Sequence, residues 1–175
     1  MGTNKLENLR KESSLVDRAY NFSRHAHGAQ KRVSGEPYFT HVTAVAQNLL
    51  DWEMDEATIA AGLLHDTVED TNVSLDEIKK EFGEEVTFLV NGVTKLGKIK
   101  YRGEEGQAET MRKMILAMAE DLRVVLIKLA DRRHNMQTLK ALPPLKQKRI
   151  AQETMDIYSP IAYRLGMQRL SGELE

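Results

Sequence analysis

The segment Leu63-Leu64-His65-Asp66-Thr67-Val68-Glu69-Asp70 places one imidazole and three carboxylates within six residues, directly after an apolar run. Residues 57–64 have almost no polar face, so a helix there would be buried on all sides and would bring His65 and Asp66 inward. Buried carboxylates need a cation or hydrogen-bond donors. If the helix continues, Glu69 and Asp70 lie one turn on, beside this pair. The segment indicates a metal ion, although a single His-Asp pair is more often structural and needs matching groups elsewhere.

Composition narrows the classes of protein to consider. The 175 residues suit one domain, and 41% hydrophobic residues suffice for a core. With 25 Lys+Arg against 26 Asp+Glu, the net charge of -1 gives no global field that would recruit nucleic acid or an anionic membrane. Because the chain has no cysteine, disulfides, thiolate ligands and cysteine nucleophiles are excluded. Any metal must bind nitrogen and oxygen.

The ends of the chain carry little targeting information. The N-terminal residues have no apolar signal region, and no segment approaches the roughly twenty apolar residues that span a bilayer. We therefore expect a cytoplasmic protein without a membrane partner. Residues 173–175 end without a cap or turn, so we expect 1–175 to be a single domain cut from a longer protein.

Hydrophobic periodicity predicts an all-α fold. The segment 122–131 is rich in β-branched residues, but its pattern runs on to Leu142 without a turn signal and no partner strand is evident, so we predict a helix. The helices are expected at 13–28, from Pro37 to Leu50, from Asp55 into the opening segment, at 74–83, 86–96, 107–118 and 122–142, and from Pro143-Pro144 to a stop before Pro160.

Two further features have competing interpretations. The segment 97–106 combines three glycines with three cations, which is typical of a solvated connector or of a flap whose cations meet phosphates. His25 and His27 are two residues apart and so point to different sides of a helix. We expect both to be structural.

Other candidate ligands stand where buried stripes begin or end. His41 opens the apolar stripe of the second predicted helix, and Asp131 closes the apolar run 122–131, with Asn135 on the same face. With His65 and Asp66 they offer two nitrogens and two oxygens, which suits Mn²⁺, Fe²⁺ or Zn²⁺ better than Ca²⁺. In an octahedral ion, two positions remain for water and a phosphate oxygen. This is the arrangement for metal-assisted phosphate ester hydrolysis.

Five motifs in order strengthen this interpretation. They are His27-Gly28-Ala29-Gln30, Ser34-Gly35-Glu36-Pro37-Tyr38 running to His41, Leu64-His65-Asp66 with Val68-Glu69-Asp70-Thr71, Gly92-Val93-Thr94-Lys95-Leu96, and Leu129-Ala130-Asp131-Arg132 with His134-Asn135-Met136. The spacing resembles the HD phosphohydrolase superfamily, and the motifs resemble the N-terminal hydrolase domain of the RelA/SpoT-type (p)ppGpp synthetase/hydrolase family. The resemblance covers the chain from about Val16 onward.

The resemblance implies an HD-domain helical bundle and a specific reaction. The implied substrate is the nucleotide ppGpp or pppGpp, from which the 3′-diphosphate leaves as pyrophosphate in alarmone degradation during the stringent response. One Mn²⁺ ion is implied, in preference to Fe²⁺ or Zn²⁺. His41, His65, Asp66 and Asp131 match the metal ligands of the family, Glu69 and Asp70 match its catalytic acids, and Arg32, Asn135 and Thr138 match residues around the nucleoside.

The chain departs from the family pattern at Val33, Val42 and Tyr163, and two alternative functions stay open. Val33 stands where the family commonly has lysine, so a charge near the nucleotide is missing. The synthetase domain that follows in the family is absent, and we expect it in the full-length protein. The alternatives are an HD enzyme that hydrolyses another nucleotide or phosphoester, and a non-catalytic module that binds nucleotide and regulates a synthetase.

Overall fold

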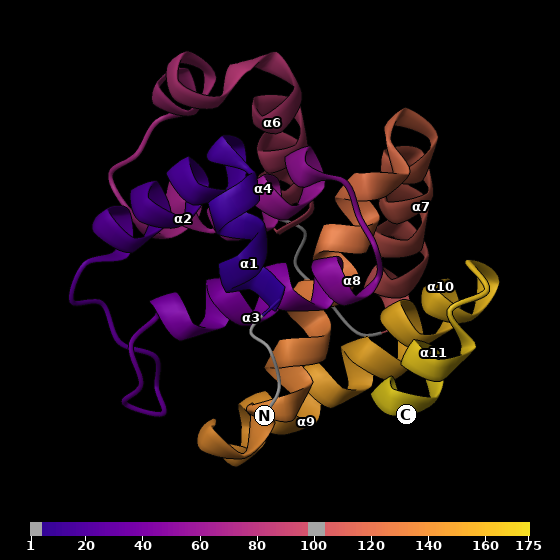
Figure 1. Ribbon diagram of the computed structural model, residues 1–175. Coiled ribbons are helices and arrows are strands. Elements are labelled where there is room, and N and C mark those ends of the chain that lie inside the picture. The colour runs from indigo at the N-terminus through magenta and orange to yellow at the C-terminus, as the bar shows by residue number, and fades with distance from the viewer. Residues whose placement is uncertain (1–4, 98–103) are drawn as a thin grey trace.

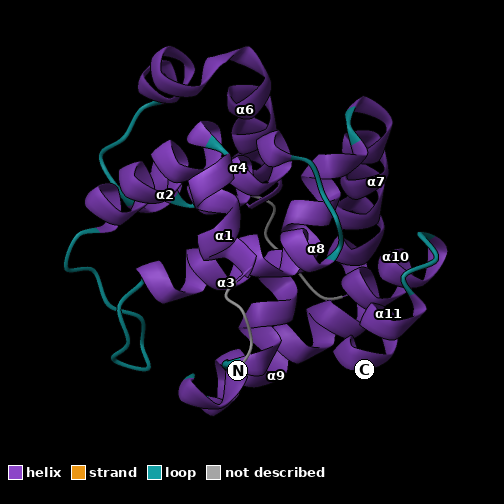
Figure 2. Ribbon diagram, in the orientation of Figure 1, coloured by secondary structure: helices purple, strands orange, loops and turns teal. Residues whose placement is uncertain are grey.

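The computed structural model describes residues 5–97 and 104–175, and these form a bundle of helices with no named strand (Figure 1; Figure 2). The predicted all-α fold is confirmed. The helices are α1 (Lys5–Glu12), α2 (Ser14–His27), α3 (Phe39–Asp51), α4 (Glu56–Leu64), α5 (Thr67–Asp70), α6 (Leu75–Gly97), α7 (Glu104–Glu120), α8 (Leu122–Gln137), α9 (Pro144–Glu153), α10 (Ser159–Arg164) and α11 (Gln168–Leu174), with a 3₁₀ turn at Leu139–Ala141 and a π-helical turn at Thr154–Tyr158.

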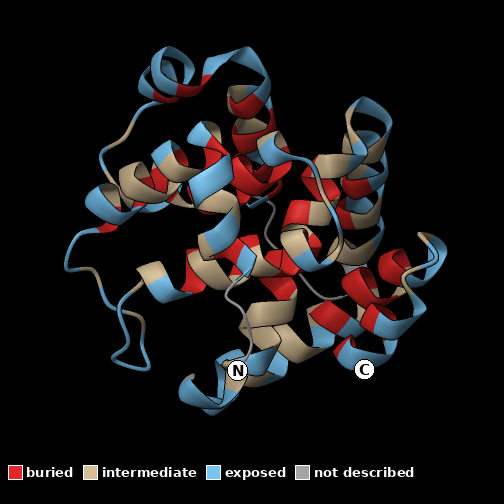
Figure 3. Cartoon of the chain, in the orientation of Figure 1, coloured by how far each residue is buried: buried red, intermediate tan, exposed pale blue. Residues whose placement is uncertain are grey.

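Helix α4 lies at the centre of the core, as its sequence predicts. Every residue from Thr58 to Leu64 is buried, and the helix packs against α2, α3, α6 and α8 (Figure 3). Gly62 lets α3 approach closely, because a Cβ there would collide with Leu49. The apolar composition of α4 thus accounts for its central position, and Gly62 for its close contact with α3.

Side-chain caps fix where several helices begin. The carboxylate of Asp55 accepts a hydrogen bond from the backbone N–H of Thr58 at 2.7 Å, and Asp121 caps α8 in the same manner. Ser74 and Glu77 bond reciprocally to each other's backbone N–H groups, and this capping box fixes the start of the helix that was predicted from residue 74. The predicted break at Gly83 is also present, as a kink in α6 where this glycine has a φ of 82°.

Two predicted helix boundaries near the site are wrong. Helix α3 begins at Phe39, not Pro37, because the preceding loop folds back on itself: Pro37 pairs with Lys31 in a β-bridge, and the N–H of Tyr38 donates to the carbonyl of Gln30 at 2.8 Å. The central helix ends at Leu64. His65 and Asp66 lie in a turn before α5, so Glu69 and Asp70 belong to a separate short helix.

The C-terminal third also differs from prediction. Helix α8 ends at Gln137, five residues before Leu142. The last predicted helix does not stop before Pro160. The N–H of Ser159 bonds to the carbonyl of Thr154 in the π-helical turn, and Gln107 donates to the carbonyl of Asp156 at 3.2 Å, the group four residues before the proline. These bonds compensate for the donor that proline lacks, and the chain continues into α10.

Other segments add to the predicted set. Helices α1 and α11 were not predicted, and α7 starts at Glu104 rather than 107. The cations of the predicted loop at Lys98, Lys100 and Arg102 lie outside the described residues. None of the described helices combines the length and apolar character needed to cross a bilayer.

Candidate functional site

The predicted ligands come together from three places in the chain. His41 lies on α3, His65 and Asp66 follow α4, and Asp131 lies on α8. His41 Nε2 is 3.5 Å from Asp66 Oδ2 and 3.3 Å from Asp131 Oδ1, and His65 Nε2 is 3.0 Å from Asp66 Oδ2 and 4.0 Å from Asp131 Oδ1. The ligand atoms of His41, His65 and Asp66 all lie within 4.8 Å of one another, which is close enough for one ion.

His65 is oriented as a metal ligand. Its Nδ1 lies 2.8 Å from the carbonyl of Gly62, and since a carbonyl only accepts, Nδ1 carries the proton of that bond. Nε2 is buried and faces the carboxylates, with Asp66 Oδ2 as its nearest charged neighbour at 3.0 Å. Burial lowers the pKa of His65, but the carboxylate of Asp66 raises it to about 9. The acids therefore favour positive charge at this point.

Asp131 is held on both oxygens. Asn135 Nδ2 donates to Oδ1 at 2.6 Å, and Lys128 Nζ donates to Oδ2 at 3.0 Å. Burial would raise the pKa of Asp131, but Lys128 and His41 hold it well below its usual range. Asn135 and Lys128 thus fix the orientation of the Asp131 carboxylate, as the hydrogen-bond partners of a metal ligand do.

The acid pair lies at the solvent-facing edge of this cluster. Partial desolvation, together with the carboxylates of Asp66 and Asp70, raises the pKa of Glu69. The hydroxyl of Tyr38 lies 2.7 Å from both Asp70 Oδ2 and Asp66 Oδ2, so it can donate to either carboxylate and connects the two. A hollow of about 510 Å³ next to the pair is lined by Ala26, His27, Gln30, Glu69, Asp70, Thr71 and Asn72.

The predicted nucleoside residues meet only in part. Arg32 Nη2 donates to Asn135 Oδ1 at 2.8 Å, so these two are in direct contact although they are 103 residues apart. Thr138 lies at the end of α8, where its hydroxyl donates to the carbonyl of His134 at 3.0 Å, with no hydrogen bond to Arg32. The loop before α3 and the end of α8 therefore form one surface.

His25 and His27 lie outside the ligand cluster. His25 is exposed and its Nδ1 bonds to the carbonyl of Asn21. His27 is buried, bonds to Gln30 and stacks on Tyr38 with ring centroids 4.8 Å apart. Both contacts agree with the structural interpretation.

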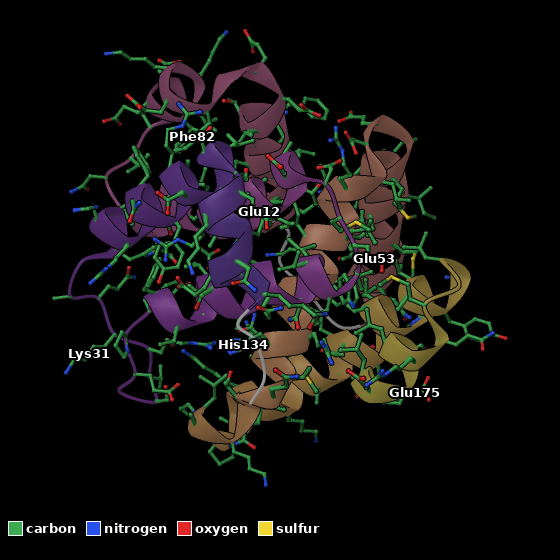
Figure 4. All side chains as sticks on the ribbon, viewed as in Figure 1. Glu12, Lys31, Glu53, Phe82, His134 and Glu175 are labelled. Atoms are coloured by element: carbon green, nitrogen blue, oxygen red, sulfur yellow. The ribbon has the colours of Figure 1, made fainter. Side chains whose placement is uncertain are left out.

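Three residues of the site were assigned no role from the sequence, although two of them stand in the quoted motifs: Tyr38, Lys128 and His134. Each lies three residues from a candidate ligand, Tyr38 before His41, Lys128 before Asp131 and His134 after Asp131. That spacing places side chains on one helix face, so it is a signal that could have found them. His134, labelled in Figure 4, lies on α8 with its Nδ1 2.8 Å from His41 Nδ1. Burial, with Arg32 and His41 nearby, lowers the pKa of His134 to about 4.

Comparison with known proteins places the chain in a family. The profile of a family described as HD domain matches residues 19–168. The chain is 56% identical over 162 residues to a probable guanosine-3′,5′-bis(diphosphate) 3′-pyrophosphohydrolase of Synechocystis, covering 92% of the chain and 21% of that protein. It is 54% identical over 160 residues to a GTP pyrophosphokinase of Streptomyces coelicolor, covering 91% of the chain and 19% of that protein. The chain thus spans about a fifth of these curated relatives.

A solved structure is also similar. It is described as a metazoan ortholog of SpoT that hydrolyzes ppGpp. It superposes with a TM-score of 0.66 at 27% identity, covering 83% of this chain and 84% of that one. The likeness therefore extends over most of both chains.

Proposed function

The chain belongs to the HD domain family, and on that premise we propose that it hydrolyses ppGpp or pppGpp. The 3′-diphosphate leaves as pyrophosphate, and GDP or GTP remains. In this proposal His41, His65, Asp66 and Asp131 hold one divalent ion, Mn²⁺ in preference to Fe²⁺ or Zn²⁺, and Glu69 and Asp70 are the catalytic acids.

One observation supports the proposal most directly. Two imidazoles and two carboxylates from separate parts of the chain lie within reach of one ion, and the buried Nε2 of His65 points at this group, 3.0 Å from Asp66 Oδ2. Two buried carboxylates this close together need a cation or hydrogen-bond donors, and a divalent ion would supply the charge. The donor set fits a borderline-hard divalent ion.

The bound ion would supply Lewis acidity, lowering the pKa of water and polarising a phosphate oxygen. The protein's own groups supply the rest. Glu69, whose pKa is raised, is a stronger base than an ordinary carboxylate and takes the proton of the attacking water. Tyr38 keeps Asp70 at a fixed place beside Asp66.

The nucleotide would occupy the surface between the loop before α3 and the end of α8. The guanidinium of Arg32 can stack on the guanine, and Asn135 and Thr138 can line the nucleoside. The hollow beside Glu69 and Asp70 has room for the departing diphosphate.

The test is turnover of ppGpp by this chain with added Mn²⁺, followed by chromatographic measurement of GDP and pyrophosphate. We expect both products in equal amounts, and a rate at least 100-fold lower in Glu69→Gln and in Asp66→Asn, since each loses a group needed in the transition state. The exposed His25→Gln is the matched control and should keep the full rate. An inert unaltered chain would refute the proposal.

A second function is favoured by the names of the relatives, which include a GTP pyrophosphokinase. In that case the chain binds ppGpp without turnover and regulates a synthetase domain elsewhere in a longer cytoplasmic protein. Calorimetric binding of ppGpp without product formation would favour this alternative. If the chain hydrolyses another nucleotide and not ppGpp, the other alternative is favoured, which is an HD phosphohydrolase with a different substrate.

A further inference from the structure

Arg32 and the candidate metal ligands are joined by two chains of hydrogen bonds. Arg32 Nη1 lies 3.0 Å from His134 Nδ1, and that same nitrogen lies 2.8 Å from His41 Nδ1. Arg32 Nη2 donates at 2.8 Å to Asn135 Oδ1, whose Nδ2 donates at 2.6 Å to Asp131. One guanidinium on the loop before α3 thus reaches two ligands, each through one intermediate residue.

The chemistry of the donors fixes the direction of the first chain. A guanidinium has only N–H groups and cannot accept, so His134 Nδ1 must be the acceptor of the bond from Arg32. The ring of His134 then has no proton at Nδ1. His41 Nδ1 lies 2.8 Å from the same atom, so the two donors share its single lone pair. The proton between the two rings then belongs to His41.

The consequence for His41 concerns its other nitrogen. A neutral imidazole with its proton on Nδ1 has a lone pair on Nε2. Nε2 is the atom that lies 3.5 Å from Asp66 and 3.3 Å from Asp131, so it faces the candidate ion. Without an acceptor at Nδ1, the proton would move to Nε2, where the carboxylates accept it. An imidazole protonated at Nε2 cannot bind a metal through that atom.

The second chain follows the same logic. Because Asn135 Oδ1 accepts from Arg32, its amide must turn Nδ2 toward Asp131, which is the orientation that lets it donate to a carboxylate. Arg32 therefore fixes which nitrogen of His134 lacks a proton, and it fixes the orientation of the Asn135 amide.

We propose that His134 is a positioning residue for the metal site, which holds His41 in the tautomer whose Nε2 is free to bind the ion. Arg32 supports His134 by donating a hydrogen bond to it. A residue of the nucleoside surface thus also affects how well the site binds the ion. Only the identity of the ion rests on the proposed function. The tautomer of His41 is a property of the chain alone.

The first measurement needs no metal. Long-range ¹H–¹⁵N spectra of ¹⁵N-histidine-labelled protein, at slightly alkaline pH and with chelator, report which ring nitrogen of each histidine carries the proton. We expect His41 protonated at Nδ1 in the unaltered chain and in His134→Gln, whose side-chain oxygen can accept. In His134→Leu we expect the proton of His41 on Nε2. Assignment comes from the spectrum of His41→Gln.

The second measurement is the affinity for Mn²⁺ by calorimetry, without nucleotide. Removing an outer-shell partner of a metal-ligating histidine typically costs 10- to 100-fold in affinity, and we expect a loss of that size in His134→Leu. His134→Gln should bind within about threefold of the unaltered chain, and Arg32→Leu should fall between them. His25→Gln, which changes an exposed histidine that bonds only to the backbone of Asn21 among the contacts described, should bind as the unaltered chain does.

The outcomes separate this inference from the proposed function. If the unaltered chain binds no Mn²⁺, the proposed function fails, and the spectra still decide the inference. An Nε2-protonated His41 in the unaltered chain would overturn it, and so would His134→Leu with an unchanged His41 tautomer. Circular dichroism of each variant shows whether it folds. If His134→Leu does not fold, the Arg32→Leu spectrum decides, because losing the donor to His134 should leave a mixture of His41 tautomers.

Discussion

At the scale of single residues, the position of Glu69 depends on a glycine. A Cβ on Gly97 would lie 2.7 Å from Glu69 Oε1 and 3.0 Å from Oε2. The carboxylate therefore rests against the backbone at the end of α6, a place that any side chain would fill. Since the carboxylate is the far end of a flexible side chain, it can move away at small cost in stability.

We therefore expect Gly97→Ala to separate activity from stability. The alanine displaces Glu69 from the water it activates, and a misplacement of about 1 Å can cost roughly 100-fold in rate. The turnover number for ppGpp should fall by about that factor, while the midpoint of thermal unfolding changes by less than about 3 °C. Steady-state kinetics and a melting curve check this. An unchanged turnover number would show that Glu69 is not the base.

Val33 is a second residue whose replacement is informative. Its side chain is 68% exposed, next to Arg32, where the related family commonly has lysine. Val33→Lys adds a cation near a strongly anionic substrate, and an exposed charge pair contributes up to about 1 kcal/mol. We expect a two- to fivefold lower KM for ppGpp at low salt, and the gain should disappear at about 1 M salt. If Val33→Lys and the unaltered chain have the same KM for ppGpp at low salt, the nucleotide does not bind near residue 33.

The sequence predicts some of these residues and not others, for a physical reason. His41, His65, Asp66 and Asp131 each begin or follow an apolar stripe, so the pattern alone marks them as buried polar groups. The contact of Arg32 with His134 depends on two segments 102 residues apart, and periodicity carries no information about such pairs. The space beside Gly97 is likewise visible only once α5 and α6 are packed.

At the scale of helices, Arg123 connects three of them. Its guanidinium bonds to Asp55 at 3.2 Å, to Glu85 at 2.7 Å and to Asp121 at 2.8 Å. Asp55 and Asp121 are the caps of α4 and α8, and Glu85 lies on α6. Hydrogen bonds from Arg123 lower the pKa of Asp121, and bonds from Thr58 and the charge of Arg123 outweigh burial and lower the pKa of Asp55.

This network predicts a pH-dependent loss of stability in Arg123→Leu. A carboxyl whose pKa is lowered by folding stabilises the protein above its unfolded pKa of about 4, and that contribution is lost as pH falls through the lowered value. The variant should unfold with roughly 1 kcal/mol less free energy at about pH 7, since the groups are partly exposed. The difference should shrink at about pH 3.

Urea unfolding at the two pH values measures this. Lys79→Leu is the matched control, because Lys79 and Glu84 form a single exposed pair, and we expect no measurable change. An Arg123→Leu variant that loses the same free energy at both pH values would argue for lost packing rather than lost charge pairing.

The helix boundaries show where local rules are insufficient. Pro160 predicts a stop, but a π-helical turn and the side chain of Gln107 satisfy the backbone around it. Pro37 suits a helix start, but the β-bridge to Lys31 keeps it in the loop. In both cases a contact from another segment overrides a correct local preference, whereas the helix starts near Asp55 and Ser74 depend on local capping and were predicted.

At the scale of the whole molecule, the candidate site lies where three helices of the core meet. Helices α3, α4 and α8 pack on one another, and each carries or leads directly into one or two of the polar groups that meet at their crossing. A divalent ion that binds only the folded chain must therefore stabilise the whole fold. The N-terminal and C-terminal helices contribute none of these groups, which explains why the ligands could be predicted without knowing about α1 and α11.

We expect the chain to melt at a higher temperature with Mn²⁺ than with a chelator. An ion at 100 times its dissociation constant adds about 2.7 kcal/mol, which corresponds to roughly 5–10 °C for a chain of this length. Differential scanning calorimetry measures the shift, and Asp66→Asn should remove it. A shift of the same size in Asp66→Asn would locate the ion at another site.

The most direct test of the account is anomalous diffraction at the manganese edge from crystals of this chain grown with Mn²⁺. The account predicts one strong peak within bonding distance of His41, His65, Asp66 and Asp131 together. A peak elsewhere, or no peak with these four side chains ordered, would contradict it.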